Sequence, residues 1–197
     1  MQTTLFGRAE VPEFDASFAA ASRHRLDARG GWVERVPGWI TGHQALFDEL
    51  RSVLRWRRME RVMYERVVAV PRLLASLPES GEAPLLRLMA DTLGQRYGYR
   101  FDAIQLALYR DGADSVAWHR DKGVRDWAHG CVCVASLGGS RTFAVRPLGG
   151  GATRAWSTGW GDLVVMGGTS GRHWEHAVPK VKRAEPRMAL MFRHGPP

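Results

Sequence analysis

The spacing of hydrophobic and polar positions changes near residue 100 and divides the chain into two patterns. Before that point, apolar residues recur at helical spacing in two stretches, one from Thr41 to Leu54 and one that begins at Pro84. After Phe101, apolar and polar residues alternate over short runs that are separated by Gly, Asp and Pro turns. The pattern therefore predicts a mainly β protein with flanking helices, an α+β fold.

Proline, glycine and threonine mark the expected ends of the elements in the first half. A strand over Val67–Val70 is expected to stop at Pro71, because proline cannot donate to a sheet ladder. Thr41 is expected to cap the first helix, and Gly94 is expected to end the second as its C-cap. Residues 14–29 show mixed character and predict a loose extension or a short helix.

Length and charge narrow the class of protein. A chain of 197 residues can bury the core of a single domain, and nothing suggests an oligomer, so a monomer is expected. No run of eighteen apolar residues and no basic-then-apolar leader occurs, which predicts no membrane span and a cytoplasmic location. The net charge of +8 favours a polyanionic partner such as nucleic acid. A general bias of the composition toward arginine is the competing explanation.

Three residues are candidates for a metal site. His119 and Asp121 are two positions apart, so in an extended segment their side chains project to the same side, and His176 follows a later strand-like run. Two imidazoles and one carboxylate leave open positions on a bound Fe(II), which favours oxidation over hydrolysis. A surface histidine beside a solvated aspartate is the alternative for the bare pair.

Two arginines near the end of the chain are candidates for binding a dicarboxylic acid. In a strand, Arg187 and Arg193 share one face, and two forked guanidiniums suit two carboxylates. Tyr109 could donate to the same ligand, and Gln105 shares the face of Tyr109 in its own strand. The alternatives are a solvent-exposed position for the two arginines at the rim of a barrel, and core packing for the tyrosine.

Arginines crowd the stretch from Arg51 to Arg72, together with Trp56 and Tyr64. Arginines can contact phosphates, while an aromatic side chain can fill the gap that a flipped base leaves. We expect part of residues 55–75 to form a lid over nucleic acid. An arginine-rich, solvated helix end followed by a strand is an equally good interpretation.

Taken together, the ordered motifs resemble the AlkB family of Fe(II)- and 2-oxoglutarate-dependent dioxygenases, which demethylate alkylated nucleobases. The stretches that carry the resemblance are Leu108-Tyr109-Arg110, Trp118-His119-Arg120-Asp121, Ser136-Leu137-Gly138, Arg141-Thr142-Phe143, Gly161-Asp162-Leu163, His173-Trp174-Glu175-His176 and Pro186-Arg187 to Phe192-Arg193. The resemblance is close over residues 100–194 and looser over Val36–Ile40 and Val70–Arg72. An ordered set of this kind is much more specific than any one of its parts.

The resemblance implies a double-stranded β-helix (jelly roll) and a role for each matching residue. It implies that His119, Asp121 and His176 bind the Fe(II), and that Tyr109, Arg187 and Arg193 hold 2-oxoglutarate, with O2 as the third reactant. It also implies three parts of one dioxygenase domain: an N-terminal extension over residues 1–30, helical support and a nucleotide-recognition lid over 31–99, and the catalytic core over 100–195. The residues expected at the substrate are Arg57, Arg58, Tyr64, Arg72, Trp118 and Arg141.

The chain departs from the family pattern in three places. Ala107 and Ala189 stand where relatives usually carry asparagines, and Lys122-Gly123 stands where relatives often carry acidic residues. We expect Gln105 to replace one missing amide in binding 2-oxoglutarate. The function that these residues favour is oxidative demethylation of N-alkylated bases in DNA or RNA, with release of formaldehyde and succinate. The alternative is a 2-oxoglutarate-dependent oxygenase that acts on a protein or a small molecule.

Overall fold

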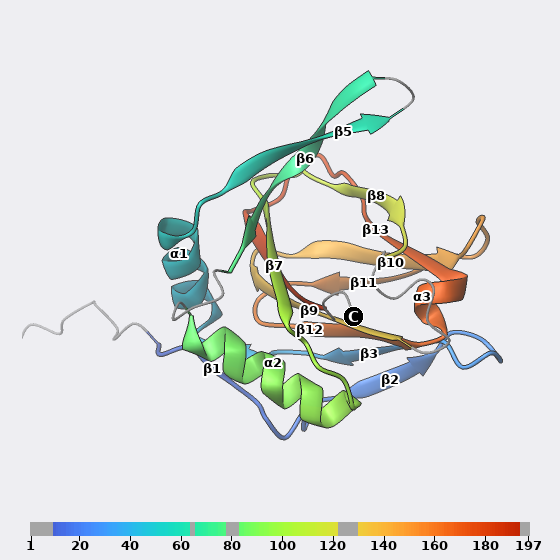
Figure 1. Ribbon diagram of the computed structural model, residues 1–197, viewed down its shortest axis with the longest axis horizontal. Coiled ribbons are helices and arrows are strands. Elements are labelled where there is room, and N and C mark those ends of the chain that lie inside the picture. Colours follow the sequence, from blue (N-terminus) through green and yellow to red (C-terminus); the bar gives the residue numbers. More distant parts are fainter. Residues whose placement is uncertain (1–9, 64–65, 78–82, 122–129, 194–197) are drawn as a thin grey trace, which may run out of the picture.

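Two antiparallel sheets build most of the protein. The computed structural model describes residues 10–63, 66–77, 83–121 and 130–193 (Figure 1). An eight-stranded sheet has the order β2-β3-β12-β9-β14-β7-β6-β5, and a four-stranded sheet has the order β11-β10-β13-β8. The strands are β1 (Glu13–Phe14), β2 (Ser22–Arg25), β3 (Trp32–Val36), β4 (Ile40–Thr41), β5 (Arg57–Met63), β6 (Arg66–Ser76), β7 (Ala103–Tyr109), β8 (Val116–His119), β9 (Gly130–Gly138), β10 (Arg141–Pro147), β11 (Arg154–Thr158), β12 (Leu163–Gly168), β13 (Trp174–Val178) and β14 (Arg187–Arg193). This is the expected mainly β architecture of a double-stranded β-helix with flanking helices.

The helices α1 (His43–Val53) and α2 (Pro84–Tyr97) cover one side of the larger sheet, while α3 (Ser170–His173) is a single turn before β13 (Figure 1). The alternation along β7, β9 and β14 explains why the helices bind there. Every second side chain of these strands is apolar and packs with the helices in the main core. Members of this core from the strands are Leu106, Leu108, Cys131, Cys133, Ala135, Leu137, Met188, Leu190 and Phe192, and from the helices Leu46, Phe47, Leu50, Leu86, Met89 and Leu93.

The intervening positions of the same strands face the other way, into the space between the two sheets. In register, Arg187 pairs with Tyr109, Ala189 with Ala107, and Met191 with Gln105. The candidate site residues of β7 and β14 therefore share one face of the sheet. They occupy the positions that alternate with the apolar residues facing the helices. The helices α1 and α2 stabilise the sheet from behind.

The N-terminal segment differs from the expected loose extension or short helix. Residues 14–29 contribute the end of β1 and all of β2, and β2 joins the large sheet through β3. Phe14 and Phe18 pack on Trp39, with ring centroids 5.1 and 5.9 Å apart, so tertiary contacts override the local preference. The strand β2 is polar and lies at the edge of the sheet, so its sequence does not alternate between apolar and polar residues.

Both long helices end differently from the expectation. α1 begins at His43 after Gly42, and no side-chain hydrogen bond caps it, so Thr41 does not serve as the cap. α2 continues through Gly94 to Tyr97 and ends at Gly98, whose φ of 76° suits glycine. A Cβ at Gly94 would lie 2.6 Å from the carbonyl oxygen of Tyr99, so this glycine serves close packing within the helix.

The hairpin of β5 and β6 projects beyond the two sheets at the top of the view (Figure 1). The expected stop at Pro71 is wrong, since β6 continues through it to Ser76. The β5–β6 register shifts between Arg58, which pairs with Leu73, and Glu60, which pairs with Ala69, so Pro71 has no register partner in β5. Arg51 lies in the last turn of α1, which ends at Val53, and residues 57–63 form a strand, so the alternative of a helix end followed by a strand describes the backbone here. None of the helices in the described part of the chain is long and apolar enough to cross a membrane.

Candidate functional site

The three candidate metal ligands converge at the ends of two paired strands. His119 is the last residue of β8, Asp121 follows two residues later, and His176 lies in the middle of β13. His119 and His176 are partners in the β8–β13 register, and their ring centroids lie 4.2 Å apart. One ligand atom from each of the three residues lies within 4.8 Å of the other two, so one ion can contact all three. The structure thus brings together the three residues that the sequence analysis singled out.

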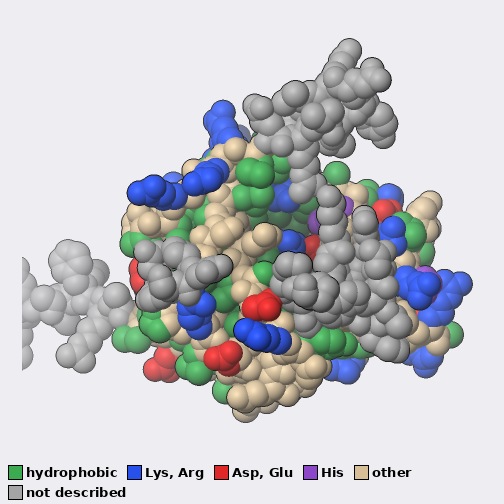
Figure 2. Space-filling view, viewed as in Figure 1, with side chains coloured by type: hydrophobic (Ala, Val, Ile, Leu, Met, Phe, Trp, Pro, Cys, Tyr) green, Lys and Arg blue, Asp and Glu red, His purple; other side chains and the backbone are tan. Residues whose placement is uncertain are grey.

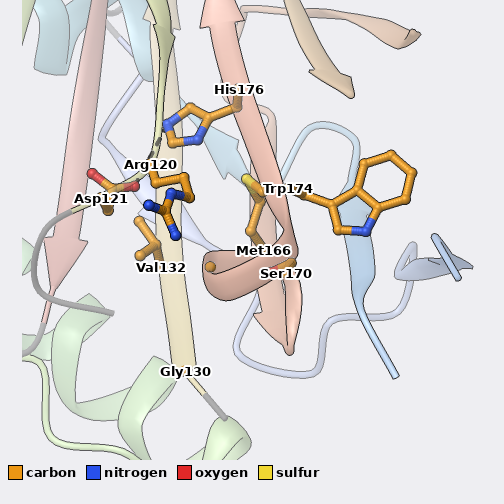
Figure 3. Close-up of a pocket in the computed structure, with 9 residues that line it drawn as sticks. Arg120, Asp121, Gly130, Val132, Met166, Ser170, Trp174 and His176 are labelled. Atoms are coloured by element: carbon orange, nitrogen blue, oxygen red, sulfur yellow. Dashed lines mark ion pairs between the residues drawn. The ribbon is translucent and has the colours of Figure 1, made fainter. Parts of the chain in front are cut away.

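Both imidazoles can offer a ring nitrogen to a metal ion. The Nδ1 of His119 lies 2.9 Å from the carbonyl oxygen of Ala117, which can only accept, so Nδ1 carries the hydrogen and Nε2 is left for a metal. Burial lowers the pKa of His176 to about 4, and the ring is therefore neutral near pH 7. Figure 3 shows the imidazole of His176 turned toward the carboxylate of Asp121, 3.5 Å away from Nε2 to Oδ2.

Asp121 is ionised and oriented by an arginine. Burial would raise the pKa of its carboxyl, but His176 and Arg193 outweigh burial and the pKa is lowered. Nη2 of Arg193 lies 2.6 Å from Oδ1, while Oδ2 faces His176. The arginine thus holds one carboxylate oxygen and leaves the other on the side of the imidazoles. Two neutral imidazoles and one ionised carboxylate are the donor set of an Fe(II) site with open positions.

The guanidinium of Arg193 is shared among Asp121, Gln105 and Met191, whose Sδ lies 3.5 Å from Nη2. Nη1 donates to Oε1 of Gln105 at 2.9 Å, and Nη2 donates to Asp121. Nε is buried and has no hydrogen-bond partner among the described residues. Gln105 therefore reaches the site through Arg193, and the nitrogen that remains for a ligand carboxylate is Nε.

Arg187 is the second arginine of the site, and it is almost completely buried, with 1% of its surface exposed. Nη2 donates to Oγ of Ser136 at 2.7 Å, whereas Nε and Nη1 have no partner within the described part of the chain. Its carbon Cζ lies 5.2 Å from the ring centroid of Tyr109. Burial, which the nearby charge of Arg141 reinforces, lowers the pKa of Arg187. A buried guanidinium with two unused nitrogens fits a carboxylate ligand, because an uncompensated buried charge is costly.

The floor between the two arginines is apolar. Ala107 and Ala189 are direct partners in the β7–β14 register, and both are buried. They form a small apolar cluster with Tyr109 and Val178, against which further side chains pack. The two departures from the asparagines of the family are thus one local change, in which two facing polar side chains are replaced together by methyl groups. Between the cationic ends, a methylene chain of a dicarboxylic acid would meet apolar surface.

Ser136 is a site residue to which the sequence analysis gave no role. It lies on β9, is 1% exposed, and is the register partner of Ala189. The signal in the sequence is a single hydroxyl at an inward position of an otherwise apolar strand. A hydroxyl that accepts from Arg187 can orient this guanidinium without neutralising it.

Arg141 and Trp118 occupy other places than the metal ligands. The guanidinium of Arg141 donates to the carbonyl oxygens of Asp111, Asp114 and Pro179 at 3.0, 2.8 and 2.7 Å. Trp118 lies under Arg146, whose Cζ is 4.1 Å from the indole centroid, on the opposite side of β8 from His119. The structure therefore does not bring Trp118 together with the metal ligands.

The expected substrate residues of the lid lie in and beside the β5–β6 hairpin. Arg57 and Arg58 are exposed at the start of β5. Arg72 donates to the carbonyl oxygen of Ser115 at 3.1 Å, and its charge contributes to lowering the pKa of Asp121. Tyr64, Lys122 and Gly123 lie outside the described residues.

Two hollows adjoin the site. A groove of ≈ 620 Å³ runs along the base of the hairpin and is lined by Val53, Leu54, Arg55, Arg57, Met59, Leu74, Ala75, Ser76 and Gln105. This volume lies in the range of ~300–1,000 Å³ that is typical of ligand clefts. A cavity of ≈ 10 Å³, with room for about one water molecule, lies beside Asp121 and His176, with Met166 and Ser170 in its lining (Figure 3). Figure 2 shows histidine, acidic and basic side chains meeting in the central hollow of the same face.

The sequence of the chain matches the model of a known protein family. The model of the family described as the 2OG-Fe(II) oxygenase superfamily matches residues 51–194, which include all three metal ligands and both arginines of the site. The matched region covers most of the chain. It begins before the β5–β6 hairpin and ends at the last described strand.

Curated relatives agree with the family model. The alpha-ketoglutarate-dependent dioxygenase alkB homolog 3 of Homo sapiens is 28% identical over 191 residues, which cover 82% of this chain and 66% of that protein. The DNA oxidative demethylase ALKBH2 of Mus musculus is 30% identical over 120 residues, which cover 56% of this chain and 50% of that protein. The chain spans slightly less than two thirds of the length of the alkB homolog 3 proteins that it matches.

Solved structures support the fold. The structure of OsALKBH1 superposes with a TM-score of 0.58 at 13% identity, covering 88% of this chain and 100% of that one. An oxidoreductase of the 2OG-Fe(II) oxygenase family from Burkholderia pseudomallei gives a TM-score of 0.50 at 15% identity, with 89% of this chain and 86% of that chain covered. At these identities the likeness shows the common fold alone.

Proposed function

Because the chain belongs to the 2OG-Fe(II) oxygenase superfamily, and within it to the AlkB family, we propose that it demethylates N-alkylated bases in DNA or RNA by oxidation. The reaction reverses alkylation damage directly and releases formaldehyde and succinate. The observation that carries the proposal is the convergence of His119, Asp121 and His176 beside a buried arginine with unused nitrogens. Relatives that are named as a dioxygenase and a DNA oxidative demethylase support the substrate class.

The site residues divide the work of binding. His119, Asp121 and His176 would hold Fe(II). Arg187, together with Tyr109 and Ser136, would bind the distal carboxylate of 2-oxoglutarate, and Arg193 would bind the carboxylate nearer the metal. When bound, Fe(II) and 2-oxoglutarate supply the oxidation: O2 is consumed, 2-oxoglutarate loses CO2 to become succinate, and the N-methyl carbon is hydroxylated. The resulting hemiaminal releases formaldehyde without help from a protein base.

The hairpin of β5 and β6 is the proposed nucleic-acid lid. Arg57 and Arg58 are exposed there, and the groove at its base reaches Gln105, which contacts Arg193. Figure 2 shows basic side chains gathered on this side of the hollow. Guanidiniums in this position can contact phosphates while a base enters the hollow, since phosphate contacts position a strand without reading its sequence. Arg72, at the base of the lid, is proposed to face the same substrate.

The remaining proposals concern the whole protein. The chain is proposed to work as a monomer in the cytoplasm, with residues 31–99 as support and lid for the core over 100–195. The support for this division is that the described residues after 100 include all three metal ligands, while the β5–β6 hairpin precedes them. Size-exclusion chromatography with light scattering tests the monomer.

The test of the function is a repair assay with purified protein, Fe(II), 2-oxoglutarate and an oligonucleotide that carries 1-methyladenine or 3-methylcytosine. Formaldehyde and repaired base should appear in equal amounts, and His119→Ala and Asp121→Ala should abolish both. His24→Ala is a matched control, because this imidazole lies against Trp156, with ring centroids 5.8 Å apart, and belongs to another sheet than His119 and His176. Succinate without formaldehyde or repaired base would reject the proposal and favour a protein or small-molecule substrate.

A further inference from the structure

Arg141 joins two loops that adjoin the strands of His119 and His176. It is the first residue of β10 and is buried, with 3% of its surface exposed. Its three acceptors are backbone carbonyls: two belong to the loop between β7 and β8, and the third, that of Pro179, directly follows β13. The first loop leads into the strand of His119, and the second leads away from the strand of His176.

These contacts lie at one end of the pair of strands, β8 and β13, to which His119 and His176 belong. β8 and β13 pair at His119 with His176 and at Val116 with Val178, and the register is irregular between the two pairs. An irregular ladder of this kind fixes the separation of its strands less strictly than a regular one. One guanidinium that binds the carbonyls on both sides closes the pair of strands at the end near Val116 and Val178, within a few residues of both imidazoles.

The contacts of Arg141 depend on the shape of its guanidinium. Two nitrogens of the planar guanidinium share the three carbonyls at 2.7–3.0 Å, whereas an ammonium group would have to reach all of them from one nitrogen. Asp114, which also offers one of the carbonyls, is buried and ion-paired with Arg110, so the loop itself is held in place. The Cζ of Arg141 lies 5.6 Å from the ring centroid of Tyr109, on which Arg187 also lies.

We propose that Arg141 is a positioning residue of the metal centre, which sets the separation of His119 and His176 by tying the β7–β8 loop to the end of β13. The proposal rests on the proposed function, because it assumes that the three ligands hold a metal ion. It assigns Arg141 to the backbone that carries the ligands, instead of the contact with the base that the resemblance implies. Residues that fix metal ligands typically change metal affinity by about 10–100-fold when they are replaced.

The experiment is a Co(II) titration of metal-free protein, in which the absorption spectrum reports the geometry of the bound ion. Arg141→Lys keeps the charge and loses the fork, and Arg141→Gln is a second, uncharged variant. Arg154→Lys is the matched control, because Arg154 also donates to two carbonyls, those of Arg25 and Leu26, on the neighbouring strand β11. Thermal unfolding of each metal-free variant sets a titration temperature at which all of them are folded.

Both Arg141 variants should bind Co(II) about tenfold more weakly or worse, with an altered spectrum, while Arg154→Lys should match the wild type. Wild-type affinity and spectrum in both Arg141 variants would overturn the proposal, even if their thermal stability had fallen, because the role would then be purely structural. Binding of Co(II) that His176→Ala leaves unchanged would instead overturn the metal centre, and the proposed function with it.

Discussion

The guanidinium of Arg193 forms a 2.6 Å ion pair with the carboxylate of Asp121, one of the three metal ligands. The pair links the metal centre to the proposed cosubstrate subsite through a single side chain. It also divides the nitrogens of Arg193 among three tasks: Nη2 orients Asp121, Nη1 binds Gln105, and Nε remains for a carboxylate. Metal and cosubstrate are therefore expected to bind with linked affinities.

Gln105 should affect 2-oxoglutarate binding through Arg193. A hydrogen bond to a charged group is worth about 1.5–3 kcal/mol, so Gln105→Ala should weaken the binding of 2-oxoglutarate to the Mn(II)-loaded protein by about tenfold or more. Isothermal titration calorimetry measures this affinity. Gln105→Glu keeps an oxygen for Arg193 and should retain most of the affinity. An unchanged affinity in Gln105→Ala would show that the contact with Arg193 has no part in binding.

Arg187 should be needed for binding the cosubstrate. It should also lower the stability of the protein when no cosubstrate is bound. Arg187→Met should weaken 2-oxoglutarate binding by about 2 kcal/mol or more, which is roughly 30-fold, because it removes a buried charge partner. The same change should raise the melting temperature of the metal- and cosubstrate-free protein, since it removes a buried charge that lacks a carboxylate partner. Calorimetry and thermal unfolding give the two readouts.

The control for this pair of effects is Arg146→Met. Arg146 is bound to Glu175 at 2.6 Å on the outer side of the smaller sheet, so its loss should lower stability and leave the cosubstrate affinity unchanged. A destabilised Arg187→Met variant with wild-type affinity for 2-oxoglutarate would contradict the assignment of Arg187.

Arg57 and Arg58 should contribute electrostatic contacts to nucleic acid. If each contacts one phosphate of a single strand, the double variant Arg57→Ala/Arg58→Ala should reduce the slope of log K against log salt by about 1.4. Fluorescence anisotropy with a methylated oligonucleotide measures the slope. The variant Arg29→Ala/Arg100→Ala removes the same charge from residues outside the lid and should change the slope less. Equal slopes for both double variants would place the nucleic acid elsewhere.

Glu34 should make the stability of the protein depend on pH. Its carboxylate accepts from Tyr97 Oη at 2.6 Å and lies 3.0 and 2.9 Å from Arg96 and Arg23. Burial would raise the pKa of Glu34, but these hydrogen bonds outweigh it and the pKa is lowered. A lowered folded-state pKa contributes stability above the unfolded value near 4.5, and this contribution disappears as the pH falls through the folded value.

Glu34→Gln should therefore lower the free energy of unfolding by about 2 kcal/mol at pH 7, and the difference from the wild type should shrink below pH 4.5. Urea unfolding across this range of pH measures it. Asp102→Asn is the exposed control, since its carboxylate lies 3.8 Å from Arg100 at the surface, and it should change stability little. A difference that stayed constant down to low pH would exclude a role for the charge.

The sequence predicts the core of the site because strand periodicity carries the information. His119 and Asp121, and likewise Arg187 and Arg193, lie at even spacings, and a pleated strand or its extension sends such side chains to one side. The mainly β class follows from the same alternation after residue 100. His176 is far from Asp121 in the chain, and the resemblance, not the spacing, associates them.

Other features leave no mark in the pattern of residues. The three acceptors of Arg141 are backbone carbonyls, which every residue has, so no residue type announces this contact. The polar edge strand β2 shows no alternation, and Pro71 lies in a strand because the neighbouring register shifts there. Gly94 resembles a helix end, yet a Cβ there would meet the carbonyl oxygen of Tyr99, just after the end of α2. For Arg141, β2 and Pro71, contacts that are distant in sequence override the local preference.

The most direct test of the account is a crystal structure of the protein with Mn(II) and 2-oxoglutarate. The account predicts one ion bound by His119 Nε2, Asp121 and His176, with Arg187 turned to one carboxylate of the cosubstrate and Arg193 beside the other. An ion held by other residues, or 2-oxoglutarate bound away from both arginines, would contradict it.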